Sequence, residues 1–189
     1  MFTRLWDPDG NDVASAVQRD DRRKINARRI DLIRTCRRTF GERFTGGIHS
    51  DSYSRTQVSK DLLLPWSDTQ KRAYLETMKS HSICVATTGL HSSIGWRFAE
   101  YVAASRAVVT ESLTFEVGGN FKQGRNYLEF SDSDSLIEVI TYLLADRRRV
   151  VQMMESNRRY YEAFLRPDAL ILNTLIHALG LSEGAPMTD

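Results

Sequence analysis

The sequence has 189 residues and a net charge of +2 at neutral pH, and 41% of its residues are hydrophobic. This length and composition suit one domain with a buried core, and so small a charge gives no indication of binding to nucleic acid or membranes. No apolar run approaches the ~20 residues of a membrane span, and the N-terminal residues do not resemble a secretory signal. Cys36 and Cys84 lie in apolar patterns typical of small buried residues, so we expect no disulfide and a cytoplasmic location.

Strand-like and helix-like patterns alternate from the first residues onward. Residues 1–6 predict a strand, the turn Asp7-Pro8-Asp9-Gly10 follows, and an arginine-rich helix within residues 14–39 ends at Gly41. Further along we expect a short strand at 43–48, a loop at 49–59 and a short buried segment at 62–65. The next helix begins with Ser67 or Asp68 as its cap and runs to about residue 80.

The second half of the chain continues the alternation and ends in helices. Strands are expected at 83–86, 107–110 and 126–130, a helix at about 93–105, and an irregular glycine-rich segment at 112–125. Helices follow at about 133–145, 147–164 and 167–180, and Pro167 suits a first helical turn. The pattern predicts an α/β fold: a single Rossmann-like domain over residues 1–180, with a parallel sheet, helices on both faces and extra C-terminal helices. Residues 181–189 are expected to form a flexible tail.

The loop TTGLHSS at residues 87–93 lies between an expected buried strand and an expected helix. Ligands of parallel α/β sheets bind beyond the carboxyl ends of the strands, and the free N–H groups of a helix N-terminus attract anions. Thr88, Gly89, His91, Ser92 and Ser93 are therefore candidates for a phosphate site. The alternative interpretation is that Ser92 or Ser93 is an ordinary N-cap of the helix.

Glu100 lies on the same helix in an otherwise apolar stretch, where a carboxylate needs a partner. Arg97, three residues earlier, can supply one as an ion pair. The functional alternative is that the carboxylate accepts the two hydroxyl groups of a ribose. Trp96, one turn before Glu100, is more typical of a core residue than of a stacking platform for a ligand.

Other charged patterns favour ordinary structural roles. The arginine-rich helix at 19–43 also carries acids and hardly any aromatic residues, which favours a solvated face over nucleic-acid binding. Asp132 and Asp134 have the spacing of a metal-binding pair, but they open a helix, which favours capping. The four histidines are scattered without partners at ligand spacing, so we expect no metal site and no cofactor. The sequence lacks a P-loop, a Gly-x-Gly-x-x-Gly and a Gly-x-Ser-x-Gly motif.

Two stretches resemble a known family. They are WRFAEYVAASRAVVTE at 96–111 and EVGGNFKQGRNYLEFSDSDSLIEVITYLLADRRRVVQMMESNRRYYEAFLRP at 116–167. Together they resemble the C-terminal, donor-nucleotide-binding half of GT-B glycosyltransferases of the group 1 type. In that family an acid-bearing helix precedes a strand and a loop, and an NYL-x-F strand and helices with LL-x-D and M-x-x-N follow. The resemblance covers about residues 83–166 and extends loosely to the first strand, where TRL resembles the family's GRL.

The resemblance implies that the protein transfers a sugar from a UDP- or GDP-sugar to an acceptor without a metal ion. It implies that Glu100 binds the ribose and that Arg4, together with Arg97 and the loop residues, contacts the donor diphosphate; it assigns no catalytic residue. Two positions depart from the family pattern. Ser92 stands where retaining members carry a glutamate, and Asp7-Pro8-Asp9 stands where a lysine is expected, so the resemblance does not imply a retaining mechanism.

The family folds as two Rossmann-like domains that face each other across a cleft, and this chain has room for one. We therefore expect the acceptor side to come from a separate N-terminal domain or chain. Two alternatives stay open. The first is a non-catalytic α/β module that binds a protein partner, and the second is a nucleic-acid binder that uses the helix at 19–43.

Overall fold

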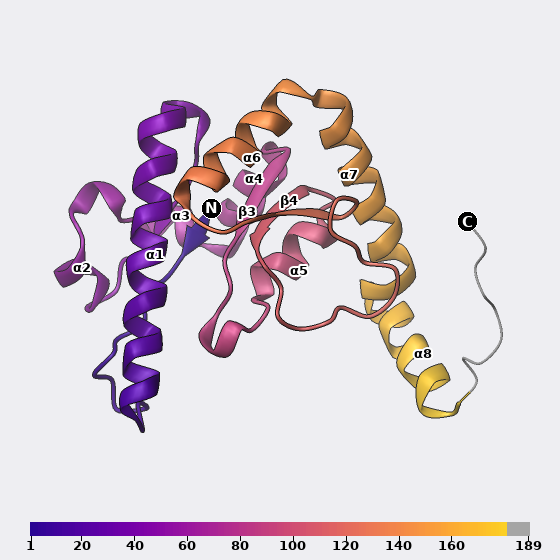
Figure 1. The fold of residues 1–189 in the computed structure, drawn as a ribbon, viewed down its shortest axis with the longest axis horizontal. Helices are drawn as coiled ribbons and strands as arrows, with labels where there is room; N and C mark the ends of the chain where they lie inside the picture. The colour runs from indigo at the N-terminus through magenta and orange to yellow at the C-terminus, as the bar shows by residue number, and fades with distance from the viewer. Residues whose placement is uncertain (181–189) are drawn as a thin grey trace.

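The structure is a computed structural model, and it describes residues 1–180. Its strands form two parallel sheets (Figure 1). The first sheet pairs β1 (Phe2–Thr3) with β2 (Gly47–Ile48), and Leu63 forms an isolated parallel bridge with Ile48. The second sheet has the order β3 (Ile83–Ala86), β4 (Ala107–Glu111) and β5 (Tyr127–Phe130). The predicted α/β class with a Rossmann-like parallel sheet is confirmed, although the strands of the first sheet are shorter than expected.

Helices cover both faces of the second sheet because side chains alternate between the two faces of a strand. Val85 of β3 packs with α1 (Ala16–Phe40), α6 (Ser133–Ala145) and α7 (Arg147–Tyr160) in one core cluster. Its neighbours Cys84 and Ala86 pack with α4 (Lys71–Ser80) and α5 (Trp96–Ala103) in a second cluster. Both cysteines are buried and free, as predicted.

Several helix boundaries differ from the expectations. Residues 49–59 contain a short helix, α2 (Ser54–Gln57), rather than only a loop. The helix expected up to residue 80 is divided into α3 (Trp66–Thr69) and α4, because Gln70 between them has an extended backbone. Ser67 and Asp68, the predicted caps, lie inside α3 and cap neither of these two helices. Short 3-10 turns lie at Gly41–Arg43, Lys60–Leu62 and Leu90–Ser92.

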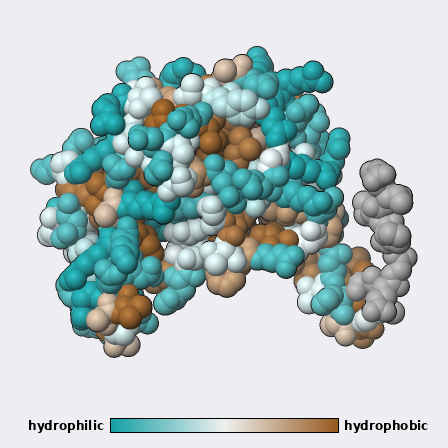
Figure 2. All heavy atoms as spheres, viewed as in Figure 1, coloured by the Kyte–Doolittle hydropathy of each residue, from teal (hydrophilic) through white to brown (hydrophobic). Residues whose placement is uncertain are grey.

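Helical segments close the described part of the chain. Asp132 caps α6 in a capping box with Ser135, as predicted, and Asp134 lies in the first turn of the helix. After α7, a π-helical turn at Tyr161–Leu165 leads into α8 (Pro167–Ala178), which begins at Pro167 as predicted. The α8 helix carries exposed apolar side chains: Leu170, Ile171, Leu172 and Leu175. Figure 2 shows brown, hydrophobic surface at the lower right, where Figure 1 places this helix.

Within residues 1–180, no helix has the length and apolar character needed to cross a membrane. The flexible tail predicted at 181–189 lies outside the described residues.

Candidate donor site at the carboxyl ends of the strands

Two neighbouring pockets lie where β1, β3 and β4 end. The larger, which we call the Glu100 pocket, has a volume of about 420 Å³ and includes Arg4, Arg97 and Glu100 in its lining. The smaller, which we call the Glu111 pocket, has a volume of about 180 Å³ and includes residues of α1 and of the loop after β3. The predicted donor residues therefore divide between the pockets. Arg4, Arg97 and Glu100 line the first, Thr88, Gly89 and Ser92 line the second, and His91 and Ser93 line neither.

The carboxylate of Glu100 is held by α4 rather than by its own helix. Lys71 donates to one carboxylate oxygen, and the hydroxyl of Tyr74 donates to the other at 2.8 Å. The alternative in which Arg97 pairs with Glu100 is therefore wrong, because the ionic partner is Lys71. Burial acts to raise the pKa of Glu100, but the hydrogen bonds from Lys71 and Tyr74 and the charges of Lys71 and Arg97 outweigh it, so the pKa lies below its usual value.

Two arginines that line this pocket each lie against an aromatic ring. The guanidinium of Arg97 lies 4.9 Å from the centre of the Tyr74 ring, and that of Arg4 lies 4.9 Å from the centre of the Trp6 ring. These contacts hold each guanidinium group against an aromatic face without neutralising its charge. Trp96 lines the same pocket and is 88% exposed, so the core role favoured by its sequence context is wrong.

The N-terminus of α5 lies at this pocket, because its first residues, Trp96 and Arg97, line it. Its N-cap is Gly95, which makes no side-chain capping bond, and the helix starts only at Trp96. The alternative that Ser92 or Ser93 caps the helix is therefore wrong. The first N–H groups of α5 have no capping side chain, and such groups attract anions.

The loop between β3 and α5 has an unusual backbone. His91 and Ser92 both have positive φ, 56° and 57°, a region that residues other than glycine seldom adopt. Gly89 leaves room for the hydroxyl of Ser93, because a Cβ there would lie 2.7 Å from that hydroxyl and the serine side chain would have to rotate away. The backbone N–H of Gly89 donates to the carbonyl of Ser93 at 2.8 Å and closes the loop. Such strain requires support from surrounding contacts.

Glu111, which the sequence did not single out, supplies part of that support. It is the last residue of β4, and only 6% of its surface is exposed. Its Oε2 accepts the backbone N–H of Thr88 at 2.6 Å and the hydroxyl of Thr88 at 2.7 Å. Its Oε1 pairs with Nε of Arg28 on α1 at 2.6 Å. An acid at the end of an apolar strand, beside a polar loop, was the signal that could have identified it.

Arg29 of α1 connects the two sheets. One of its terminal nitrogens donates to the carbonyl of Arg4 at 2.8 Å and the other to the carbonyl of Thr88 at 2.9 Å. Burial lowers its pKa to about 10, although the charge of Glu111 acts in the opposite direction. Arg22 on the same helix is also buried, so the solvated face expected for the basic helix holds for only part of it.

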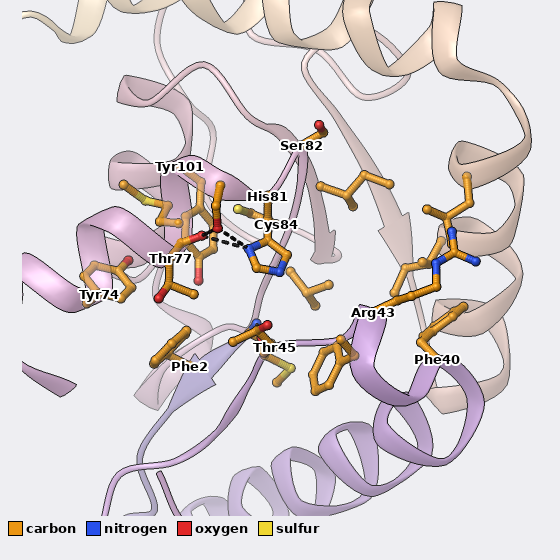
Figure 3. Close-up of a pocket in the computed structure, with 18 residues that line it drawn as sticks. Phe2, Phe40, Arg43, Thr45, Tyr74, Thr77, His81, Ser82, Cys84 and Tyr101 are labelled. Carbon is orange, nitrogen blue, oxygen red and sulfur yellow. Dashed lines mark hydrogen bonds between the residues drawn. The ribbon is translucent and has the colours of Figure 1, made fainter. Parts of the chain in front are cut away.

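A third cavity, of about 260 Å³, lies between β1 and β3 at their amino ends (Figure 3). Phe2, Tyr74, Cys84 and Tyr101 contribute to its largely apolar wall, and His81 hydrogen-bonds through Nδ1 to the carbonyl of Thr77 at 2.8 Å. None of the predicted donor residues lines this cavity. Residues 112–125 contribute to neither of the other two pockets.

The fold and the two pockets define a Rossmann-like α/β protein with polar sites at the carboxyl ends of its strands. Comparison with known families identifies its class. The sequence profile of a family described as glycosyl transferase-like matches residues 22–168, and the chain belongs to this family. The match agrees with the resemblance to group 1 glycosyltransferases. No curated protein sequence matches the chain.

Proposed function

We propose that this chain is the donor-binding half of a GT-B glycosyltransferase and that the Glu100 pocket holds the nucleoside diphosphate of a UDP- or GDP-sugar. The observation that carries the proposal is the arrangement of Arg4, Arg97 and Glu100 in one pocket at the uncapped start of α5. A carboxylate suits the two hydroxyls of a ribose, and guanidinium groups and free N–H groups suit a diphosphate.

The loop between β3 and α5 provides further candidate contacts to the donor. Thr88, Gly89, His91, Ser92 and Ser93 precede α5, and we propose that this loop contacts the phosphates or the transferred sugar. Its strained backbone and its buried supports, Glu111 and Arg29, favour a fixed rather than an adaptable loop. A fixed loop can present N–H and hydroxyl groups in the geometry that an anion needs.

The proposed chemistry follows from the charge of the leaving group. As the glycosidic bond breaks, negative charge grows on the nucleoside diphosphate. In this proposal Arg4, Arg97 and the N–H groups of α5 stabilise that charge without a metal ion, and the position of both arginines in one pocket supports it. Losing one such interaction in a dry site raises the barrier by about 2–4 kcal/mol.

The acceptor and the catalytic base are not assigned to residues of this chain. We propose that a second domain or chain supplies them by closing over the carboxyl ends of the strands. A chain that forms only one side of a two-sided cleft leaves the donor hydrated and the acceptor unpositioned. The chain alone should therefore transfer sugar slowly or not at all. The two buried free cysteines favour a cytoplasmic location, which stays a prediction.

Of the alternatives, the nucleic-acid binder receives the least support. In the basic helix α1, Arg22 and Arg29 are buried, and Lys24 and Arg28 pair with Asp20 and Glu111. Fewer cations therefore remain to neutralise phosphates than the sequence indicated.

Calorimetric titration of the full chain with UDP, GDP and their sugars, beside short RNA and DNA, tests the proposal. We expect one of the two nucleoside diphosphates to bind, and Arg97→Gln to weaken that binding. Binding of RNA or DNA without binding of either nucleotide would overturn the assignment. Binding of none of these ligands would favour the protein-interaction module.

A further inference from the structure

Lys71 contributes a charge to the Glu100 pocket that the sequence did not indicate. It is the first residue of α4, and its ammonium group both pairs with Glu100 and lies 5.6 Å from the centre of the Tyr74 ring. Its side chain is 67% exposed, so the ammonium group approaches the carboxylate from the solvent side of the pocket. The neighbouring Arg72 pairs with Glu76 on its own helix and does not line the pocket.

The charges in this pocket do not balance. Three cationic side chains, Arg4, Lys71 and Arg97, line it together with the single carboxylate of Glu100. Asp7 and Asp9, which follow β1 in the sequence, do not line this pocket. An excess of positive charge in a concave site attracts an anion with more than one negative charge.

A ribose and Lys71 cannot both occupy the same positions on Glu100. The hydroxyl of Tyr74 already donates to Oε2, and Lys71 covers Oε1. The carboxylate keeps two further lone pairs, but the ammonium group lies on the solvent side of the pocket. A ribose that enters from solvent to bind Glu100, as the proposed function requires, therefore competes with it. The Lys71 side of this ion pair is largely exposed, and ion pairs open to solvent contribute little to stability, so the ligand can displace the ammonium group at low cost.

We propose that Lys71 is a phosphate-binding residue that rests on Glu100 in the free protein and moves to the donor diphosphate when the ribose takes its place. The side chain suits this exchange, because a lysine has a flexible four-carbon stem and a compact charge with three donors. This inference rests on the proposed function, since it assumes that a nucleoside diphosphate enters the Glu100 pocket. It adds a ligand contact from α4, which the family resemblance did not include.

The exchange predicts opposite effects on two ligands. Lys71→Ala removes a phosphate contact, so the affinity for UDP or GDP should fall roughly ten- to a hundredfold. The same change frees Glu100, so the affinity for the matching nucleoside, uridine or guanosine, should stay unchanged or rise. Lys71→Arg, which retains the charge, should restore most of the diphosphate affinity.

Titration calorimetry of the full chain with UDP, GDP and the two nucleosides measures these effects, with the nucleosides determined by competition. Arg72→Ala is the matched control and should alter neither affinity, because this neighbour lies outside the pocket. Equal losses for diphosphate and nucleoside in Lys71→Ala would show that Lys71 only shapes the pocket and would overturn the inference. An unchanged diphosphate affinity would overturn it as well.

These measurements distinguish a failure of the proposed function from a failure of the inference about Lys71. If the wild-type chain binds neither UDP nor GDP, the donor site itself is wrong, and the role of Lys71 is overturned with it. If the wild-type chain binds one of them and Lys71→Ala binds it equally well, only the role of Lys71 is wrong. Melting curves of each variant show that a lost affinity does not reflect a lost fold.

Discussion

Thr88 is held by Glu111 through two hydrogen bonds, one from its backbone N–H at 2.6 Å and one from its hydroxyl at 2.7 Å. On the other side of the same residue, Arg29 donates to the carbonyl of Thr88 at 2.9 Å and to that of Arg4 at 2.8 Å. The start of the loop after β3 is thus fixed from both directions. Through Arg29 the loop is also fixed to Arg4, which directly follows β1 and is a predicted diphosphate contact.

Glu111→Gln should lower the free energy of unfolding by about 1–3 kcal/mol, because a buried charged acceptor of several hydrogen bonds is lost. The amide can still accept one bond from Thr88, but its NH₂ group then faces the donors of Arg28. Urea denaturation measures the change. Glu138→Gln, an exposed glutamate on α6, is the matched control and should be neutral. A loss equal to that of the control would show that the Glu111 contacts contribute nothing to stability.

Glu100→Gln should weaken the binding of UDP or GDP roughly ten- to a hundredfold while hardly changing the melting temperature. The reason is that the ion pair of Glu100 with Lys71 lies at the exposed side of the pocket, where such pairs contribute little to stability. Calorimetric titration and melting curves of the two proteins measure both effects. Glu76→Gln, on the exposed side of α4, serves as the control. A lowered melting temperature with unchanged affinity would assign Glu100 a structural role.

Trp96 should report the arrival of a ligand in the Glu100 pocket. Its indole is 88% exposed at the pocket lining, so a bound nucleotide or sugar ring should change its fluorescence. Trp66 is also exposed, at 73%, and Trp66→Phe removes its background emission. Trp6, the third tryptophan, remains in each of these proteins and contacts Arg4. In the Trp66→Phe variant UDP or GDP should shift or quench the emission, and the additional change Trp96→Phe should remove most of the response. A response of unchanged size without Trp96 would place the ligand elsewhere.

The cysteines should be unreactive in the folded protein. Burial raises the pKa of Cys36 to about 11 and that of Cys84 to about 11. Because the pKa is raised, both thiols stay protonated at neutral pH, and the reactive thiolate becomes abundant only as the pH approaches those values. Iodoacetamide labelling at pH 8, followed by mass spectrometry, should modify neither residue until urea is added. Rapid labelling of Cys84 without denaturant would indicate that solvent enters the cavity between β1 and β3.

The local pattern of the sequence determined most of the secondary structure. Strands at 83–86, 107–110 and 126–130 and the helix that begins at Pro167 followed from apolar periodicity and from turn residues. Asp132 was recognisable as a cap because a cap needs only the next three residues. Burial of Cys36 and Cys84 followed from the same periodicity, since each lies on an apolar face of its own element. The roles of Arg4 and Glu100 came from the family resemblance and stay predictions.

Only the tertiary structure decided which groups meet at the candidate site. Glu100 meets Lys71, 29 residues away, rather than Arg97 on its own helix, because α4 and α5 contribute to the same core cluster on one face of the second sheet. Arg29 meets Thr88 across 59 residues, and Glu111 meets it across 23. Periodicity states which face of an element is buried, but not which neighbour covers that face. The neighbour depends on how helices and strands pack around the two sheets, and this also left Trp96 exposed although its sequence context indicated a core residue.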